Sequence, residues 1–176
     1  MSDGALVVGY GNALRRDDGL GWHAAERLTR DPRLAGATVL QRHQLTPELA
    51  VDVSRAAFVV FVDASRGPAA QLAIDPVTPA AVAAIPWSHH VDPAILLALA
   101  RDLYGRAPDA VAVSVGVASV AMGRRLSHVL QRLLPEVVDT VARLVAEHER
   151  AGAPAGIPEN AAIVSGAPRW AGAGDA

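Results

Sequence analysis

The chain has 176 residues, of which 51% are hydrophobic and 19% charged, and its formal net charge is −2. This length is enough for one domain with a hydrophobic core. The sequence contains no cysteine, which excludes disulfides, thiolate metal sites and a cysteine nucleophile. It has no dense basic patch and no apolar stretch of membrane-spanning length, so we expect neither nucleic-acid binding nor a membrane segment. Because the first residues include an acid and a glycine rather than a basic segment, we expect no signal peptide and a soluble cytoplasmic protein.

Strand and helix patterns alternate along the first part of the chain. Residues 5–9 form a short Val-rich run that ends in glycine, which predicts a buried strand. Leu20, Ala24 and Leu28 share one face of a helical pattern that ends before Asp31-Pro32. The predicted elements are a strand over 5–9, a helix over 19–29, a strand over 38–41 and a helix from Thr46-Pro47 to about Ser54.

The second part of the chain continues the alternation. The run FVVFV over 58–62 is typical of a central strand buried on both faces, and Asp63 is expected to end it. Asp92-Pro93 predicts a helix start and Gly105 its C-cap. The remaining predictions are a weaker strand over 72–77, a central strand over 110–117 and a helix over 126–148 that bends at Pro135.

These patterns predict the fold class α/β. We expect a single-domain, three-layer α/β/α architecture with a mainly parallel, twisted sheet of about five strands. Residues 1–150 form the expected domain. Residues 151–176 are rich in Ala, Gly and Pro, which indicates a flexible C-terminal tail.

Polar side chains follow three of these elements. Asp17 and Asp18 come after the first strand, Asp63 follows the most apolar strand, and His89-His90 precede the helix at Asp92. Each has a simpler interpretation: a helix cap for the first pair, a turn residue for Asp63, and surface histidines for the last pair. Because loops at the carboxyl ends of neighbouring strands share one crevice, two carboxylates and an imidazole there would suit a divalent ion such as Ni, Zn, Fe or Mn.

A dinucleotide site is poorly supported. The segment GYGNAL has Leu14 where the third glycine of G-x-G-x-x-G belongs, and no acid ends the second predicted strand. The chain also lacks a P-loop, a G-x-S-x-G serine elbow and an H-E-x-x-H helix.

Three blocks of the sequence resemble one family. GYGNALRRDDGLG resembles the opening G-x-G-N-x-L-x-x-D-[DE]-G-x-G of the [NiFe]-hydrogenase maturation endopeptidases. FVVFVDAS and SHHVDPAILLALA follow in the same order, and VSVGVAS is similar to a later strand of that family, so the resemblance covers about residues 5–147.

The resemblance implies a phosphorylase/hydrolase-like fold and removal of a C-terminal peptide from a [NiFe]-hydrogenase large-subunit precursor after nickel insertion. It also implies that Asp18, Asp63 and His90 are the catalytic and nickel-contacting residues, with Asp18 rather than Asp17 as the ligand. The nickel would arrive on the substrate, and another divalent ion can take its place in a crystal. His89 remains an alternative to His90.

The chain departs from that family in two places. RHQLT replaces a glycine-rich turn, which adds His43, and ASVAMGRRLSH replaces a loop with proline and glutamate, which adds Arg124 and Arg125. The second change leaves the recognised hydrogenase group open. Two other functions remain as alternatives, a non-proteolytic nickel-sensing scaffold for hydrogenase assembly and an unrelated metal-dependent hydrolase.

Overall fold

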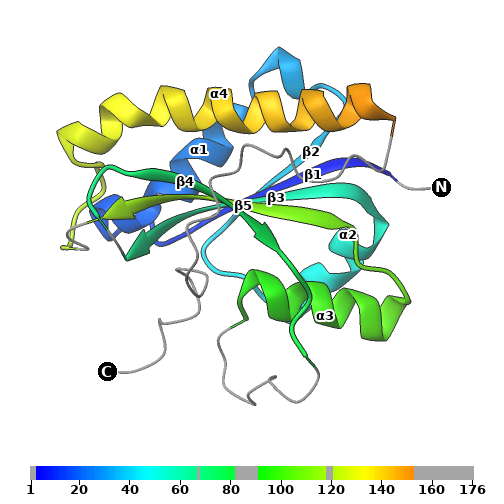
Figure 1. Ribbon diagram of the computed structural model, residues 1–176. Coiled ribbons are helices and arrows are strands. Elements are labelled where there is room, and N and C mark those ends of the chain that lie inside the picture. The colour runs from blue at the N-terminus through cyan, green and yellow to red at the C-terminus, as the bar shows by residue number, and fades with distance from the viewer. Residues whose placement is uncertain (1–2, 67, 82–90, 118–120, 153–176) are drawn as a thin grey trace.

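The computed structural model of the chain describes residues 3–66, 68–81, 91–117 and 121–152. Within these ranges, five strands form one sheet in the order β2-β1-β3-β5-β4 (Figure 1). The strands are β1 (Asp3–Tyr10), β2 (Thr38–Arg42), β3 (Ala56–Arg66), β4 (Leu72–Val77) and β5 (Asp109–Val117). All neighbouring pairs are parallel except β4 and β5, so one edge strand is antiparallel.

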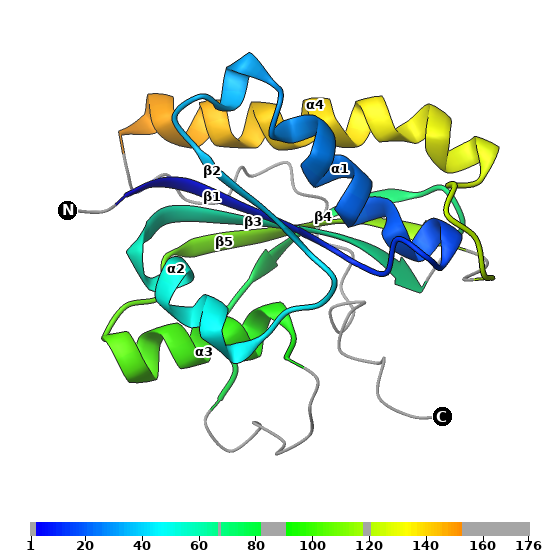
Figure 2. The ribbon, with the colours of Figure 1, turned by 180° about the vertical axis from the view of Figure 1, so that it is seen from behind.

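Helices cover both faces of this sheet. The α-helices are α1 (Leu20–Leu28), α2 (Ala50–Arg55), α3 (Pro93–Tyr104) and α4 (His128–Ala151). Three short 3-10 turns precede α1, β2 and α2: η1 (Arg16–Gly19), η2 (Pro32–Leu34) and η3 (Pro47–Leu49). Helices α1 and α4 lie on one face and α2 and α3 on the other (Figures 1 and 2). The predicted three-layer α/β/α fold with a mainly parallel sheet is confirmed.

The two faces have separate hydrophobic cores because successive strand residues point to opposite sides. Val60 of β3 packs with α1 and α4. Its neighbours Val59 and Phe61 pack with α2 and α3. All three are at most 1% exposed, so the continuous apolar run of β3 is explained by burial on both faces.

The helix ends follow the signals in the sequence. Asp92 Oδ1 accepts a hydrogen bond of 2.8 Å from the Ile95 amide, and Gly105 ends α3 with φ 75°. Pro135 lies inside α4 without ending it. Helix α4 runs to Ala151, so all but the first two residues of the predicted tail lie outside the described residues. No helix in the described ranges is long and apolar enough to cross a membrane.

One predicted boundary is wrong. Asp63 does not end its strand, because β3 continues to Arg66 and remains paired with β5 from Asp63↔Ser114 to Arg66↔Val117. The apolar run stops at Val62 since β1, the neighbour on the other side, ends at Tyr10 and its last pair with β3 is Gly9↔Val62. Beyond Val62, β3 no longer pairs with β1, so fewer of its side chains have to be apolar. Its backbone pairing with β5 continues.

The strand order also identifies the place where a site is expected. From β1 the chain moves outward to β2 and then returns to β3 on the other side of β1. In open α/β sheets, ligands bind outside the carboxyl ends of the strands at such a reversal. Asp18, which follows β1, and Asp63 of β3 both lie at this switch point.

Candidate active site

Glycines allow the loop after β1 to fold tightly against the ends of β1 and β3. A Cβ on Gly21 would collide with the carbonyl oxygens of Val62 and Tyr10. Gly11 has φ 137°, and a Cβ there would collide with the Asp18 carbonyl and lie 3.7 Å from Asp63 Oδ1. The spacing of glycines in the first motif therefore permits the turn that carries Asp18 to approach Asp63.

The two adjacent aspartates have different surroundings. Asp17 is 8% exposed, and its Oδ1 accepts a 2.6 Å hydrogen bond from the backbone amide of Ser127, at the start of α4. Asp18 is partly exposed, and its Oδ2 accepts from the Asn12 amide at 3.2 Å. Neither carboxylate caps the helix that follows it, because the N-cap positions of η1 and α1 have no side-chain cap bond. Asp17 therefore has a structural role, and Asp18 is the carboxylate available to the crevice.

Asp63 is held by two donors. Its Oδ1 accepts from the Ala64 amide at 2.7 Å, and its carboxylate also accepts from the Tyr10 hydroxyl. Burial raises the pKa of Asp63 well above its usual value, and the negative charge of Asp18 adds to that rise, against the effect of the two hydrogen bonds. The turn interpretation of Asp63 is wrong, because the residue lies within β3. A carboxyl group in such surroundings is typical of a functional site.

Tyr10 is a site residue that the sequence patterns did not single out. Burial raises its pKa well above 10.0, and the negative charges of Asp63 and Asp92 raise it further. The alternation of side chains along β1 could have identified Tyr10. It follows Leu6 and Val8 on one face of the strand, and these residues pack with α2 and α3. Tyr10 thus connects the switch point with the start of α3.

The predicted histidine lies outside the described residues, as does His89, since these ranges omit 82–90. The chain resumes at Val91, which packs against the same core cluster as Tyr10. Within the described ranges, no group of three or more His, Cys, Asp or Glu side chains is placed to hold a metal ion. The structure thus brings two of the three predicted site residues, Asp18 and Asp63, to one place.

Three residues in segments where the sequence departs from the family motifs lie at the surface. His43 follows β2 and is exposed. Arg124 and Arg125 are exposed in the segment that precedes α4. None of the three has a recorded hydrogen bond to Asp18 or Asp63 within the described part of the chain.

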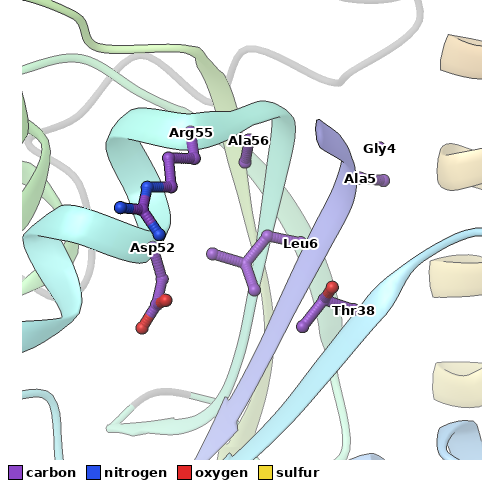
Figure 3. Close-up of a pocket in the computed structure, with 7 residues that line it drawn as sticks. All are labelled: Gly4, Ala5, Leu6, Thr38, Asp52, Arg55 and Ala56. Carbon is purple, nitrogen blue, oxygen red and sulfur yellow. The ribbon is translucent and has the colours of Figure 1, made fainter. Parts of the chain in front are cut away.

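A small pocket lies at the opposite edge of the sheet, near the start of β1 and β3. It has a volume of about 80 Å³, and Figure 3 shows the residues that line it, Gly4, Ala5, Leu6, Thr38, Asp52, Arg55 and Ala56. Asp52 and Arg55 are both exposed. This pocket is remote from the switch point, and nothing in its lining indicates a reaction.

Comparisons with known proteins identify the fold. No family model matches the chain, and no curated protein matches it. Among solved structures, the maturating endopeptidase HybD from E. coli aligns with a TM-score of 0.67 at 20% identity, over 85% of this chain and 94% of that one. The [NiFe] hydrogenase maturation protease HycI from Thermococcus kodakarensis KOD1 aligns with a TM-score of 0.66 at 19% identity, over 82% and 93%. The hydrogenase 2 maturation peptidase from Thaumarchaeota archaeon SCGC_AB-539-E09 aligns with a TM-score of 0.60 at 21% identity, over 81% and 97%. The chain therefore has the fold of the hydrogenase maturation proteases.

Proposed function

We propose that the protein is an endopeptidase that removes the C-terminal extension of a [NiFe]-hydrogenase large-subunit precursor after nickel has been inserted. The observation that carries this proposal is the position of Asp18 and Asp63 together at the switch point of a fold shared with maturation proteases. Fold likeness alone does not specify a reaction. The two carboxylates supply the chemical part of the argument.

In this proposal, Asp18, Asp63 and His90 contact nickel that the substrate carries, so nickel acts as the recognition signal. Two carboxylates and one imidazole suit such a borderline divalent ion. The surroundings of Asp63 support the assignment, because burial and the charge of Asp18 both oppose ionisation of its carboxyl group in the free protein. A cation beside both carboxylates would offset that opposition.

The roles of the surrounding residues follow from their contacts. The Ala64 amide and the Tyr10 hydroxyl orient the Asp63 carboxylate. Gly11 leaves room for the Asp18 backbone beside it. The chain has no cysteine to act as a nucleophile. A metal ion held at such a site can polarise a carbonyl group or activate water for peptide hydrolysis.

The test is a processing assay. Nickel-loaded and nickel-free large-subunit precursor from the same source are incubated with the protein, and mass spectrometry follows the C-terminus of the precursor. We expect cleavage of the nickel-loaded form alone. The Asp63→Asn variant is expected to reduce the cleavage rate at least a hundredfold, because it removes one of the negative charges that contact nickel.

Asp52→Asn is the matched control, because it makes the same chemical change at an exposed position at the other edge of the sheet. It is expected to cleave at the wild-type rate. Cleavage of both precursor forms would contradict nickel recognition. If the precursor binds but neither form is cleaved, the protein is an assembly factor rather than a protease.

A further inference from the structure

Two surface segments beside the candidate site form a single strip. The Arg16 amide donates to the Gly123 carbonyl at 2.7 Å, and the Gly123 amide donates to the Leu14 carbonyl at 2.9 Å. Asp17 adds its hydrogen bond to the Ser127 amide. Both ribbon views show the segment before α4 beside the turn that follows β1 (Figures 1 and 2). The strip is therefore fixed by bonds to the backbone and not by contacts between flexible side chains.

This strip exposes basic and apolar side chains together. We call its four exposed arginines the arginine rim: Arg15, Arg16, Arg124 and Arg125. Beside them, Leu14 is 51% exposed and Met122 is 78% exposed. Among the described residues, none of the four guanidinium groups forms an ion pair. The rim is strongly basic although the whole chain has a formal net charge of −2.

The backbone of the strip is strained where the two segments meet. Arg16 has φ 44°, a conformation that non-glycine residues rarely adopt. Gly123 has φ 151°, and a Cβ there would lie 2.9 Å from Arg16 Cγ, so the Arg16 side chain extends across Gly123. Such conformations persist only where neighbouring structure enforces them, and they are frequent at functional sites.

We propose that the arginine rim docks an acidic surface of the substrate protein, with Leu14 and Met122 as apolar contacts within the same interface. This inference rests on the proposed function, and it names the hydrogenase large-subunit precursor as the occupant. Arginine is well suited to the task because its planar guanidinium pairs with carboxylates through two parallel hydrogen bonds. Since Arg16 is two residues before Asp18, a partner docked on the rim lies beside the switch point. Complementary charge would both accelerate encounter and set orientation.

The experiment measures binding separately from cleavage. Immobilised nickel-loaded precursor is titrated with wild-type protein and with an Arg124→Glu/Arg125→Glu variant at low and high salt, and the processing rates of the same proteins are recorded. We expect the variant to raise Kd at least tenfold at low salt, with a smaller difference at high salt because exposed charges are screened. At saturating precursor, its kcat is expected to stay within threefold of the wild-type value. The matched control, Arg55→Glu/Arg106→Glu, makes the same charge change at exposed positions before β3 and β5 and should bind like the wild type.

Four outcomes would overturn the proposal. If the wild type cleaves the precursor and the rim variant has an unchanged Kd, docking at the rim is wrong while the proposed function stands. The same conclusion follows if the control weakens binding as much as the rim variant, or if the rim substitutions abolish binding to duplex DNA and leave precursor binding unchanged. A wild-type protein that neither binds nor cleaves the precursor would remove the proposed function and the docking surface with it.

Discussion

Acidic residues at the two ends of the parallel strands have opposite surroundings. We call the end where β1 and β3 finish the carboxyl edge of the sheet, and the end where they begin the amino edge. At the carboxyl edge, Asp17 is buried and burial raises the pKa of Asp63. At the amino edge, Asp52 is exposed beside a small pocket of about 80 Å³ (Figure 3). A buried carboxylate lowers stability unless it is neutralised, paired or well hydrogen-bonded. Asp17 meets that condition through its hydrogen bond from the Ser127 amide. Among the described residues, Asp63 is the acid whose pKa burial raises well above its usual value, and its position where the chain reverses direction indicates that function rather than stability determines this residue.

Substitution of a closely packed glycine at the carboxyl edge should have the largest effect on stability. Gly21→Ala at the carboxyl edge places a Cβ against the carbonyl oxygens of Val62 and Tyr10, and these atoms belong to the sheet backbone and cannot move aside. We expect the free energy of unfolding to fall by about 3 kcal/mol, measured by urea denaturation.

Gly36→Ala, just before β2, is the control at the amino edge. Its Cβ would meet only Glu149 Oε1, at 3.5 Å, and the glycine has no positive φ. We expect a change of less than about 1 kcal/mol. Equal losses in the two variants would show that close approach of α1 to the ends of β1 and β3 is not what these glycines provide.

A second comparison separates two adjacent carboxylates of the carboxyl edge. Asp17→Ala leaves the Ser127 amide without its acceptor at the start of α4. We expect a loss of about 1 to 3 kcal/mol in the free energy of unfolding. Among the described residues, Asp18→Ala removes one hydrogen bond, of 3.2 Å, from the Asn12 amide, and it should lower stability by less than about 1 kcal/mol. Thermal unfolding followed by circular dichroism measures both, and a larger loss for Asp18→Ala would reverse the structural and functional assignments.

Much of the fold was predictable from local patterns. The apolar run at 58–62, the Asp92-Pro93 helix start and the glycine at 105 each reflect a local requirement, respectively burial, capping and a left-handed residue, and each is confirmed. The end of β3 was not predictable in this way. Its last residues, Asp63 to Arg66, are held by backbone pairing with β5, which depends on a strand more than 40 residues later.

The two candidate acids, Asp18 and Asp63, could be selected from the sequence, but the groups that surround the acids of this site could not. A motif match favours Asp18 over Asp17 as the nickel ligand, and this remains a prediction. The structure shows that the Asp17 carboxylate already accepts a hydrogen bond from the Ser127 amide at the start of α4. No local pattern connects residue 17 with residue 127. The sequence patterns did not identify Tyr10, because a tyrosine between two glycines predicts a turn. Its hydrogen bond to Asp63 exists only once β1 and β3 are neighbours.

The last expected effect concerns the pH dependence of stability at Asp63 itself. Because burial raises the pKa of Asp63 above its ordinary value of 3.8, the folded protein binds this proton more tightly than the unfolded chain does. The free energy of unfolding therefore falls as pH rises from about 4 through the raised pKa. Asp63→Asn removes the titration, so we expect the variant to be more stable than the wild type at pH 7 and equally stable near pH 4, as measured by urea denaturation across that range. Asp52→Asn should show no such dependence, since the residue is exposed at the other edge. If Asp63→Asn instead lowers stability at pH 7, the hydrogen bonds from Ala64 and Tyr10 outweigh burial, and the carboxyl edge is stabilised by its acids rather than strained by them.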